Sequence, residues 1–212
     1  ATIDVKDMFF MIPLQPEDAN RFAFTWEGQQ YTFTRLPQGY RHSPTLAHYA
    51  LAQELEKISK PDNIAIYQYI DDILVGGEEI EEVGDTQQKI ISHLESLNLQ
   101  IPIEKIQKPS HEVKFLGIWW KGGMTCIPPN TLTSLDRIKM PKSRKDLQHA
   151  LGLLVFWRKH IPDFSIIARP LYNLLRKGIK WEWTASQEEA LQLLIFEATA
   201  HQALGPIHPT DP

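Results

Sequence analysis

The sequence has little cysteine and no long apolar run, and both shortages exclude classes of protein. A single cysteine, Cys126, cannot form an internal disulfide and cannot supply a zinc site built from several cysteines. No apolar segment approaches the roughly 20 residues that a membrane-spanning helix needs, so we expect no membrane partner. The eight histidines show no spacing typical of metal ligands, and we expect His42 and His48 to cap or cover a helix.

The N-terminus lacks an initiator Met, a basic start and an apolar signal run. We therefore expect the chain to be a piece of a longer polypeptide that opens within a strand. Its 212 residues, 42% of them hydrophobic and 23% charged, have an ordinary globular composition. That length is enough for one large domain or two small ones.

Positive charge does not dominate the chain, whose net charge is −4, but it is concentrated in one segment. Residues 121–180 contain twelve Lys or Arg and three acids, a net charge of +9, which leaves −13 for the remainder. This asymmetry indicates a basic face for a phosphate backbone beside an acidic, metal-binding part. The alternative is a solvated helix surface.

The acidic part has its focus in residues 64–77. Ile64–Tyr67 and Ile73–Val75 are apolar, strand-forming runs, and the pattern predicts a β-hairpin whose tight turn carries Asp71 and Asp72. Adjacent like charges at the end of a buried strand are costly unless a cation neutralises them. Carboxylate oxygens suit Mg²⁺, so the sequence predicts a divalent metal site, with a solvated Asp-Asp turn as the alternative.

The elements around this hairpin predict an α+β fold. They are, in chain order, a strand at the start of residues 2–14, a hairpin of residues 21–26 and 31–34, a helix from residue 43, the acidic hairpin, a helix after residues 78–82 and a strand at 112–120. The aromatic hairpin is expected to bury one face, and Ser43 is expected to be the N-cap of its helix. This order predicts an antiparallel sheet with helices on one face.

The sequence becomes helical and basic after Pro128, where we place a boundary. Ser143 is expected to cap one helix, and Pro170 to break the helical pattern of residues 164–175. A last helix is predicted after Thr184.

One further acid completes the predicted metal site. Asp4 lies on the first predicted strand, which could neighbour the strand that carries Asp71 and Asp72. Three converging carboxylates are what a two-metal phosphoryl-transfer site needs.

Four motifs occur in a distinctive order and spacing. They are Ile3-Asp4-Val5-Lys6-Asp7-Met8-Phe9-Phe10, Leu36-Pro37-Gln38-Gly39, Ser43-Pro44 and Tyr69-Ile70-Asp71-Asp72. The set resembles the polymerase motifs of retroviral reverse transcriptases, and the residues within the motifs are most similar to those of vertebrate endogenous retroviruses. Phe115, Leu116 and Gly117 are similar to that family's primer grip, and Leu171-Tyr172 with Trp181-Glu182-Trp183 to its connection region.

The resemblance implies an RNA-directed DNA polymerase that adds dNTPs to a primer 3′-hydroxyl on an RNA or DNA template. Asp4, Asp71 and Asp72 would hold two Mg²⁺ ions, with Asp72 as the more peripheral ligand. Lys105 would donate a proton to the leaving pyrophosphate, with a plain surface lysine as the alternative.

The resemblance also implies contacts with the incoming nucleotide. Phe9 would be the gate under the sugar, where a ring collides with a 2′-hydroxyl and selects deoxynucleotides. Core packing is the alternative for Phe9, and with Phe10 next to it core packing is a rival role for either ring. Gln38 would contact the nucleotide, and Asp7 would offer its backbone near the triphosphate.

By the same resemblance, residues 1–127 would be a palm with the fingers largely missing, 128–178 a thumb that grips duplex backbone, and 179–212 the start of the connection region. The rest of the fingers and a ribonuclease H domain would belong to the parent polyprotein. Two other functions stay open. One is an inactive retroelement remnant that at most binds nucleic acid, and the other is an interaction module that uses the edge exposed where the fingers are missing.

Overall fold

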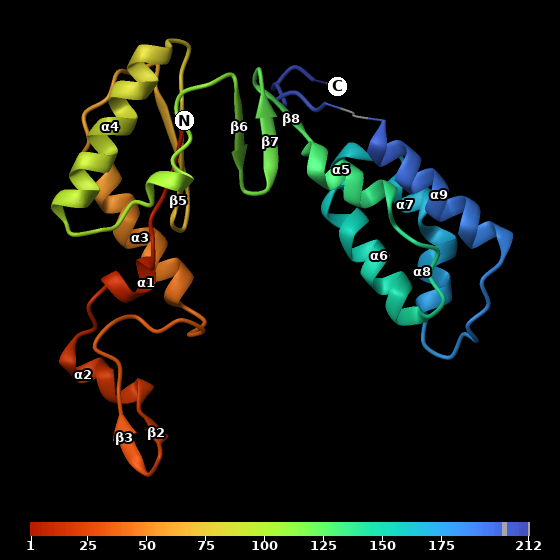
Figure 1. Ribbon diagram of the computed structural model, residues 1–212, viewed down its shortest axis with the longest axis horizontal. Helices are drawn as coiled ribbons and strands as arrows, with labels where there is room; N and C mark the ends of the chain where they lie inside the picture. The colour runs from red at the N-terminus through yellow and green to blue at the C-terminus, as the bar shows by residue number, and fades with distance from the viewer. Residues whose placement is uncertain (201–202, 212) are drawn as a thin grey trace. The chain divides into compact units, whose positions relative to one another are not determined.

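The computed structural model describes residues 1–200 and 203–211 and divides into two compact units, Ala1–Phe115 and Leu116–Pro212 (Figure 1). Each unit has its own hydrophobic core. Among the described residues, no helix is long and apolar enough to cross a membrane.

The first unit contains six strands, four α-helices and two short 3-10 helices within the described residues. The strands are β1 (Thr2–Asp4), β2 (Phe24–Trp26), β3 (Gln29–Tyr31), β4 (Ala65–Tyr69), β5 (Asp72–Gly76) and β6 (Glu112–Phe115). The helices are α1 (Met8–Met11), α2 (Pro16–Ala19), η1 (Asn20–Phe22), α3 (Ser43–Glu56), α4 (Ile80–Ser96) and η2 (Ile103–Lys105).

The central sheet of this unit is antiparallel, in the order β1-β5-β4. Ile3, Ile73 and Val75 point from the sheet into one core, which the apolar stripes of α3 and α4 complete. Alternate residues of β4 on the other face, Tyr67 and Tyr69, are more than half exposed. The predicted antiparallel sheet with helices on one face is therefore confirmed.

The aromatic hairpin forms, but the prediction that it buries one face was wrong. Strands β2 and β3 pair with Phe24 opposite Tyr31, and both rings are exposed, as is Trp26 at 64%. The rings of Phe24 and Tyr31 stack on each other at 5.6 Å between centroids. Alternation of aromatic residues favoured a buried face, whereas every residue of these two three-residue strands is exposed.

Two local details of the first unit also differ from the predictions. The N-cap of α3 is His42, and Ser43 is the first helical residue. The Ser43 hydroxyl does not cap the helix; it donates to the carbonyl of Pro37 at 2.6 Å and is fully buried.

The predicted strand at 112–120 is interrupted. It consists of β6 and β7, because Leu116 and Gly117 between them have φ values of 53° and 72°. Positive φ at two successive residues is typical of a tight two-residue turn and cannot continue a strand. After β7, Lys121 pairs with Met124, and the turn between these two residues connects β7 to β8.

The second unit is mostly helical. Its elements are β7 (Ile118–Lys121), β8 (Met124–Cys126), α5 (Pro129–Asp136), α6 (Arg144–Phe156), η3 (Arg158–His160), α7 (Phe164–Ile167), α8 (Arg169–Leu175) and α9 (Ala185–Thr199). Ser143 caps α6 as predicted, since its hydroxyl accepts from the Asp146 N–H. The predicted break near Pro170 falls at Ala168, between α7 and α8.

The boundaries of the compact units and of their cores differ from the predicted domain boundaries. Its core joins residues of α5, α6 and α8 to Leu191 and Leu194 of α9, across the predicted boundary at 178. The compact units meet at residue 115, twelve residues before the predicted end of the palm at 127. The palm, thumb and connection assignments describe function and stay predictions.

Candidate functional site

The turn between β4 and β5 presents the first carboxylate. Tyr69 pairs with Asp72, so the two residues between them, Ile70 and Asp71, form the turn, and Asp72 opens β5. Ile70 has φ of 56°, which is unusual for a β-branched residue. Such a conformation costs about 1–3 kcal/mol and persists only where the surrounding structure imposes it.

Hydrogen bonds to α3 impose this conformation. The Ile70 N–H donates to Nδ1 of His48 at 3.0 Å. The side-chain amide of Gln68 donates to the carbonyl of Ile70 at 2.8 Å and to that of His48 at 3.0 Å. Both polar backbone groups of Ile70 are therefore satisfied by groups outside the β-ladder.

Strand β1 brings the second carboxylate to this turn. It pairs antiparallel with β5, so that Asp4 lies directly opposite Asp72. One residue further, the Val5 N–H donates to the carbonyl of Asp71 at 3.0 Å. Residues far apart in the sequence thus meet as the sequence predicted, with Asp4 on a neighbouring strand beside the acidic turn.

The other edge of β1 brings Lys105 to the site. The Thr2 N–H donates to the carbonyl of Gln107, and the Lys6 N–H to that of Gln100. Gln87 of α4, which is 2% exposed, fixes this arrangement, because its side chain donates to the carbonyls of Thr2 and Gln107 at 3.0 Å each. The segment that includes η2 is thereby held along β1.

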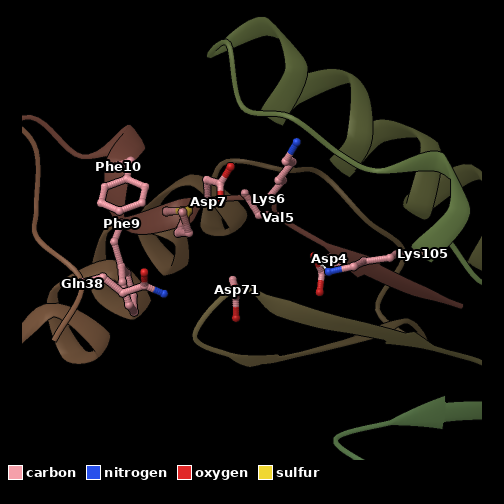
Figure 2. A pocket seen from close by; sticks show the side chains of 10 residues that line it. Asp4, Val5, Lys6, Asp7, Phe9, Phe10, Gln38, Asp71 and Lys105 are labelled. Atoms are coloured by element: carbon pink, nitrogen blue, oxygen red, sulfur yellow. Dashed lines mark hydrogen bonds and ion pairs between the residues drawn. The ribbon is translucent and has the colours of Figure 1, made fainter.

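In this position the Nζ of Lys105 lies 3.2 Å from Oδ1 of Asp4 (Figure 2). The Lys105 side chain is 56% exposed and that of Asp4 is 23% exposed. The hydrogen bond to Asp4 raises the pKa of Lys105, and the negative charges of Asp4, Asp71 and Asp72 act in the same direction. Lys105 therefore remains a cation beside the carboxylates.

A pocket of about 350 Å³ collects most of the predicted site residues. Its lining includes, in chain order, Asp4, Val5, Lys6, Asp7, Met8, Phe9, Phe10, Gln38, Asp71 and Lys105. Figure 2 shows the rings of Phe9 and Phe10 near Gln38, with Asp4 and Lys105 on the opposite side of Asp71. Asp72 is not part of this lining.

Phe9 and Phe10 both line the pocket, and they differ in exposure. Phe9 is partly buried and packs against the first core, whereas Phe10 is 42% exposed. Asp7 is exposed at the start of α1, and its φ is 51°. Gln38 is exposed in the loop before α3, which the hydrogen bond from Ser43 ties to that helix.

The carboxylates repel one another, and this repulsion contributes to the raised pKa values of Asp71 and Asp72. Burial, the charge of Asp71 and a hydrogen bond with Asp4 raise the pKa of Asp72 to about 6. Burial chiefly, with a contribution from the Asp4 charge, also raises the pKa of Asp71. A nearby cation would relieve this repulsion, and Lys105 does so only in part.

The carboxylates fit a divalent metal, although not as a complete protein cage. Across residues 1–200 and 203–211, no three His, Cys, Asp or Glu side chains are arranged to enclose a metal ion. Mg²⁺ usually binds through one or two carboxylates together with waters and substrate phosphates. Asp4 and Asp71, side by side at an open pocket, match that pattern of hard oxygen ligands.

The three residues similar to a primer grip lie where the two compact units meet in the chain. Phe115 ends β6 and is buried, while Leu116 is 41% exposed in the following turn. Gly117 has φ of 72°, so a residue with a side chain would be strained there.

The second unit has a basic groove, defined here as the pocket of about 750 Å³ along α5, α6 and the loop between them. Its lining includes Arg137, Lys139, Lys142, Lys145 and His149. Asp146 is the single acid among the lining residues. The groove lies in the basic segment that the sequence distinguished.

Sequence reasoning missed three residues that position the site, namely His48, Gln68 and Gln87. His48 was expected to cap or cover a helix, and its ring instead binds the acidic turn. Gln68 belongs to the strand next to Asp71 and Asp72, and Gln87 is a polar residue within the apolar stripe of α4. A buried polar residue on an apolar face was the one available signal for Gln87.

Comparison with known proteins relates this site to one family. The family model described as reverse transcriptase (RNA-dependent DNA polymerase) matches residues 1–120. The chain is 32% identical to the Gag-Pol polyprotein of Koala retrovirus over 197 residues, 90% of this chain and 12% of that polyprotein. It is 33% identical to the Pro-Pol polyprotein of simian foamy virus type 3 over 92% of this chain and 17% of that protein.

Solved structures of a foamy viral protease-reverse transcriptase share the fold. The one in complex with an RNA/DNA hybrid superposes with a TM-score of 0.86 at 30% identity, covering 96% of this chain and 27% of that one. The one in complex with double-stranded DNA gives 0.85 at 29% identity, covering 100% and 44%. The chain thus spans less than a fifth of the curated polyproteins described above and less than half of these structures.

Proposed function

Because the chain belongs to the reverse transcriptase family, we propose that it forms the catalytic part of an RNA-directed DNA polymerase. The observation that carries this proposal is the meeting of Asp4 with the Asp71-Asp72 turn at one pocket. Nothing in the local sequence around either motif requires that meeting; the antiparallel pairing of β1 with β5 produces it.

Asp4 and Asp71 would hold two Mg²⁺ ions, with Asp72 as a peripheral ligand. The ions, when bound, lower the pKa of the primer 3′-hydroxyl and stabilise charge on the leaving pyrophosphate. The raised pKa values of Asp71 and Asp72 support this role, because carboxylates held together against their repulsion favour a divalent cation.

The remaining pocket residues would bind the incoming dNTP. The 3′-oxygen of the primer forms a bond to the α-phosphorus of the dNTP as the bond to pyrophosphate breaks. Lys105, a cation that donates a hydrogen bond to Asp4, would donate a proton to the pyrophosphate. The Phe9 ring would exclude a 2′-hydroxyl, while Gln38 and the backbone of Asp7 would contact the nucleotide.

The basic groove would contact the phosphates of the template and primer. Four Lys or Arg in a lining with one acid supply the sequence-independent attraction that nucleic-acid backbones require. The solved relatives described above hold an RNA/DNA hybrid and double-stranded DNA, which supports the same class of partner. We assign this part, residues 128–178, to a thumb, and residues 179–212 to the start of a connection region.

Primer extension tests the proposal. The chain is incubated with an RNA template, a DNA primer, dNTPs and Mg²⁺, beside the double variant Asp71→Asn, Asp72→Asn. We expect extension by the unsubstituted chain and at least a 100-fold lower rate for the variant, about the loss seen when a catalytic electrostatic group is removed. Equal extension by both would remove these carboxylates from the mechanism.

The basic groove favours a second candidate function, nucleic-acid binding without catalysis. In that case the chain would bind duplex with an affinity that falls steeply with salt, yet extend no primer. The combination of salt-dependent binding with no extension would select this candidate over the polymerase.

A further inference from the structure

We propose that His48 is a positioning residue that holds Asp71 in its reactive orientation through the backbone of Ile70. The inference rests on the proposed function, because it concerns a residue of the same site. No motif of the sequence includes His48, which lies on α3, twenty-three residues before Asp71.

The first support is that the turn needs an external constraint. Ile70 has φ of 56°, and its β-branched side chain, which packs against the first core, disfavours that conformation. Asp71 follows immediately, so a return of Ile70 to negative φ would redirect the Asp71 carboxylate. The carbonyl of Asp71 is fixed on its other side by the Val5 N–H.

The second support is that His48 supplies the constraint from a rigid element. Its Nδ1 accepts from the Ile70 N–H at 3.0 Å, so the ring proton is on Nε2 and the ring is neutral in this arrangement. The neighbours of His48 on the buried side of α3, Ala47 and Leu51, have no exposed surface. Because these residues anchor α3 in the core, a movement of the turn would break the hydrogen bond between Ile70 and His48.

The third support is a further hydrogen bond to Ile70, this time to its carbonyl. The Gln68 amide donates to the carbonyls of both Ile70 and His48, which links the hairpin to the backbone of α3 independently of the imidazole. The two contacts hold both sides of the Ile70 residue. At the N-terminus of α3, the Ser43 hydroxyl donates to Pro37 in the loop that carries Gln38. The same helix therefore contacts both the loop with Gln38 and the turn with Asp71.

The test compares two substitutions that differ in one property. In His48→Asn the side-chain oxygen can occupy the position of Nδ1 and accept the same hydrogen bond, whereas His48→Leu has a similar volume and no acceptor. His42→Leu, on the exposed N-terminus of the same helix, is the matched control. All are made in the whole 212-residue chain.

Two readouts do not depend on polymerase activity. They are hydrogen exchange of the Ile70 amide, followed by NMR, and affinity for Mn²⁺ alone, measured by titration. For His48→Leu we expect at least about tenfold faster exchange and about 10–100-fold weaker Mn²⁺ binding, the usual effect of removing a group that orients a metal ligand. We expect both quantities to stay within about threefold for His48→Asn, the magnitude that one retained hydrogen bond allows.

A rescue distinguishes positioning from a general loss of structure. Glycine adopts positive φ without strain, so Ile70→Gly in the His48→Leu background should recover most of the Mn²⁺ affinity. In primer extension, His48→Leu should lower kcat by about 10–100-fold and leave KM for the dNTP nearly unchanged. His42→Leu should match the unsubstituted chain in every readout.

The proposal is overturned if His48→Leu keeps the Ile70 amide protected and the Mn²⁺ affinity unchanged, or if His48→Asn behaves like His48→Leu. Should His48→Leu fail to fold by circular dichroism, Gln68→Leu, which removes the bond to the Ile70 carbonyl and the bond to the His48 carbonyl, is measured in the same way with the same expectation. If the variants show the expected changes in Ile70 exchange and Mn²⁺ affinity but the unsubstituted chain extends no primer, the polymerase is rejected and the positioning role stands.

Discussion

At the scale of a single residue, the raised pKa of Asp72 reflects its burial and the repulsion among the carboxylates of the site. Its carboxyl lies between Asp71 and Asp4, and its pKa of about 6 reflects burial first and their charges second. An unfolded chain has no such neighbours, so the pKa of its Asp72 would lie near the ordinary aspartate value of 3.8. Between these two values the folded protein binds more protons than the unfolded chain, and its stability must fall as pH rises.

This difference gives a pH-dependent prediction without metal. At pH 7 in EDTA, Asp72→Asn should be more stable than the unsubstituted chain by on the order of 1 kcal/mol, because Asp72 is only partly buried and solvent screens its repulsion. The difference should shrink toward pH 4, where Asp72 is protonated. Urea unfolding at a series of pH values measures it, and a difference that grows as pH falls would contradict the assignment of the repulsion to Asp72.

At the scale of elements, the site depends on contacts that bring segments together along β1. One edge of β1 pairs with β5, and the other edge accepts the segment with Lys105 through bridges at Thr2 and Lys6. Gln87 reaches from α4 to this second edge, where its side chain donates to the carbonyl of the buried Thr2 and to that of the half-buried Gln107. Helix α4 therefore helps to align Lys105 with Asp4, although it contributes no residue to the pocket lining.

Removing this side chain should be costly. Gln87→Ala leaves the carbonyls of Thr2 and Gln107 without one donor each, and we expect a loss of about 1–3 kcal/mol in the free energy of unfolding. Gln53→Ala is the matched control, because Gln53 is exposed on α3 and its side chain bonds to the exposed Tyr49 hydroxyl. Denaturation by urea should show a change within about 0.5 kcal/mol for that variant. Equal effects of the two substitutions would mean that the buried bonds contribute nothing.

The elements also show what sequence reasoning can recover. The acidic hairpin, the strand with Asp4 and the helix after Ser43 follow from alternation, periodicity and turn residues, and their contact follows from antiparallel pairing. The positive φ at Ile70 and Leu116 does not, because neither residue type favours it and only the surrounding contacts impose it. The role of His48 stayed hidden for the same reason: a hydrogen bond to a backbone amide twenty-two residues away leaves no local pattern.

At the scale of the whole molecule, the chain has two separate apolar cores. Leu51 is fully buried in the first and Leu171 in the second, and neither cluster includes a residue of the other. The net charge divides similarly, since the basic segment, residues 121–180, lies wholly in the second unit. Each unit can therefore lose stability by itself.

This arrangement predicts local responses to core damage. Leu51→Ala and Leu171→Ala should each cost about 2–5 kcal/mol, since each removes a large side chain from a fully buried position. Hydrogen exchange followed by mass spectrometry should show the loss of protection in residues 1–115 for the first variant and in residues 116–200 for the second. Loss of protection throughout the chain in both variants would show that the two units unfold together.

The exposed aromatic hairpin has a consequence for spectroscopy. Trp26 is the only one of the six tryptophans that precedes residue 116, and it is 64% exposed, whereas Trp157 in the second core is 5% exposed. Light emitted by the blue-shifted, shielded tryptophans therefore comes from the second unit, and the emission that iodide can quench in the first unit comes from Trp26. A single fluorescence sample can thus report on the two units separately, through blue-shifted emission for the second unit and through iodide quenching of Trp26 for the first.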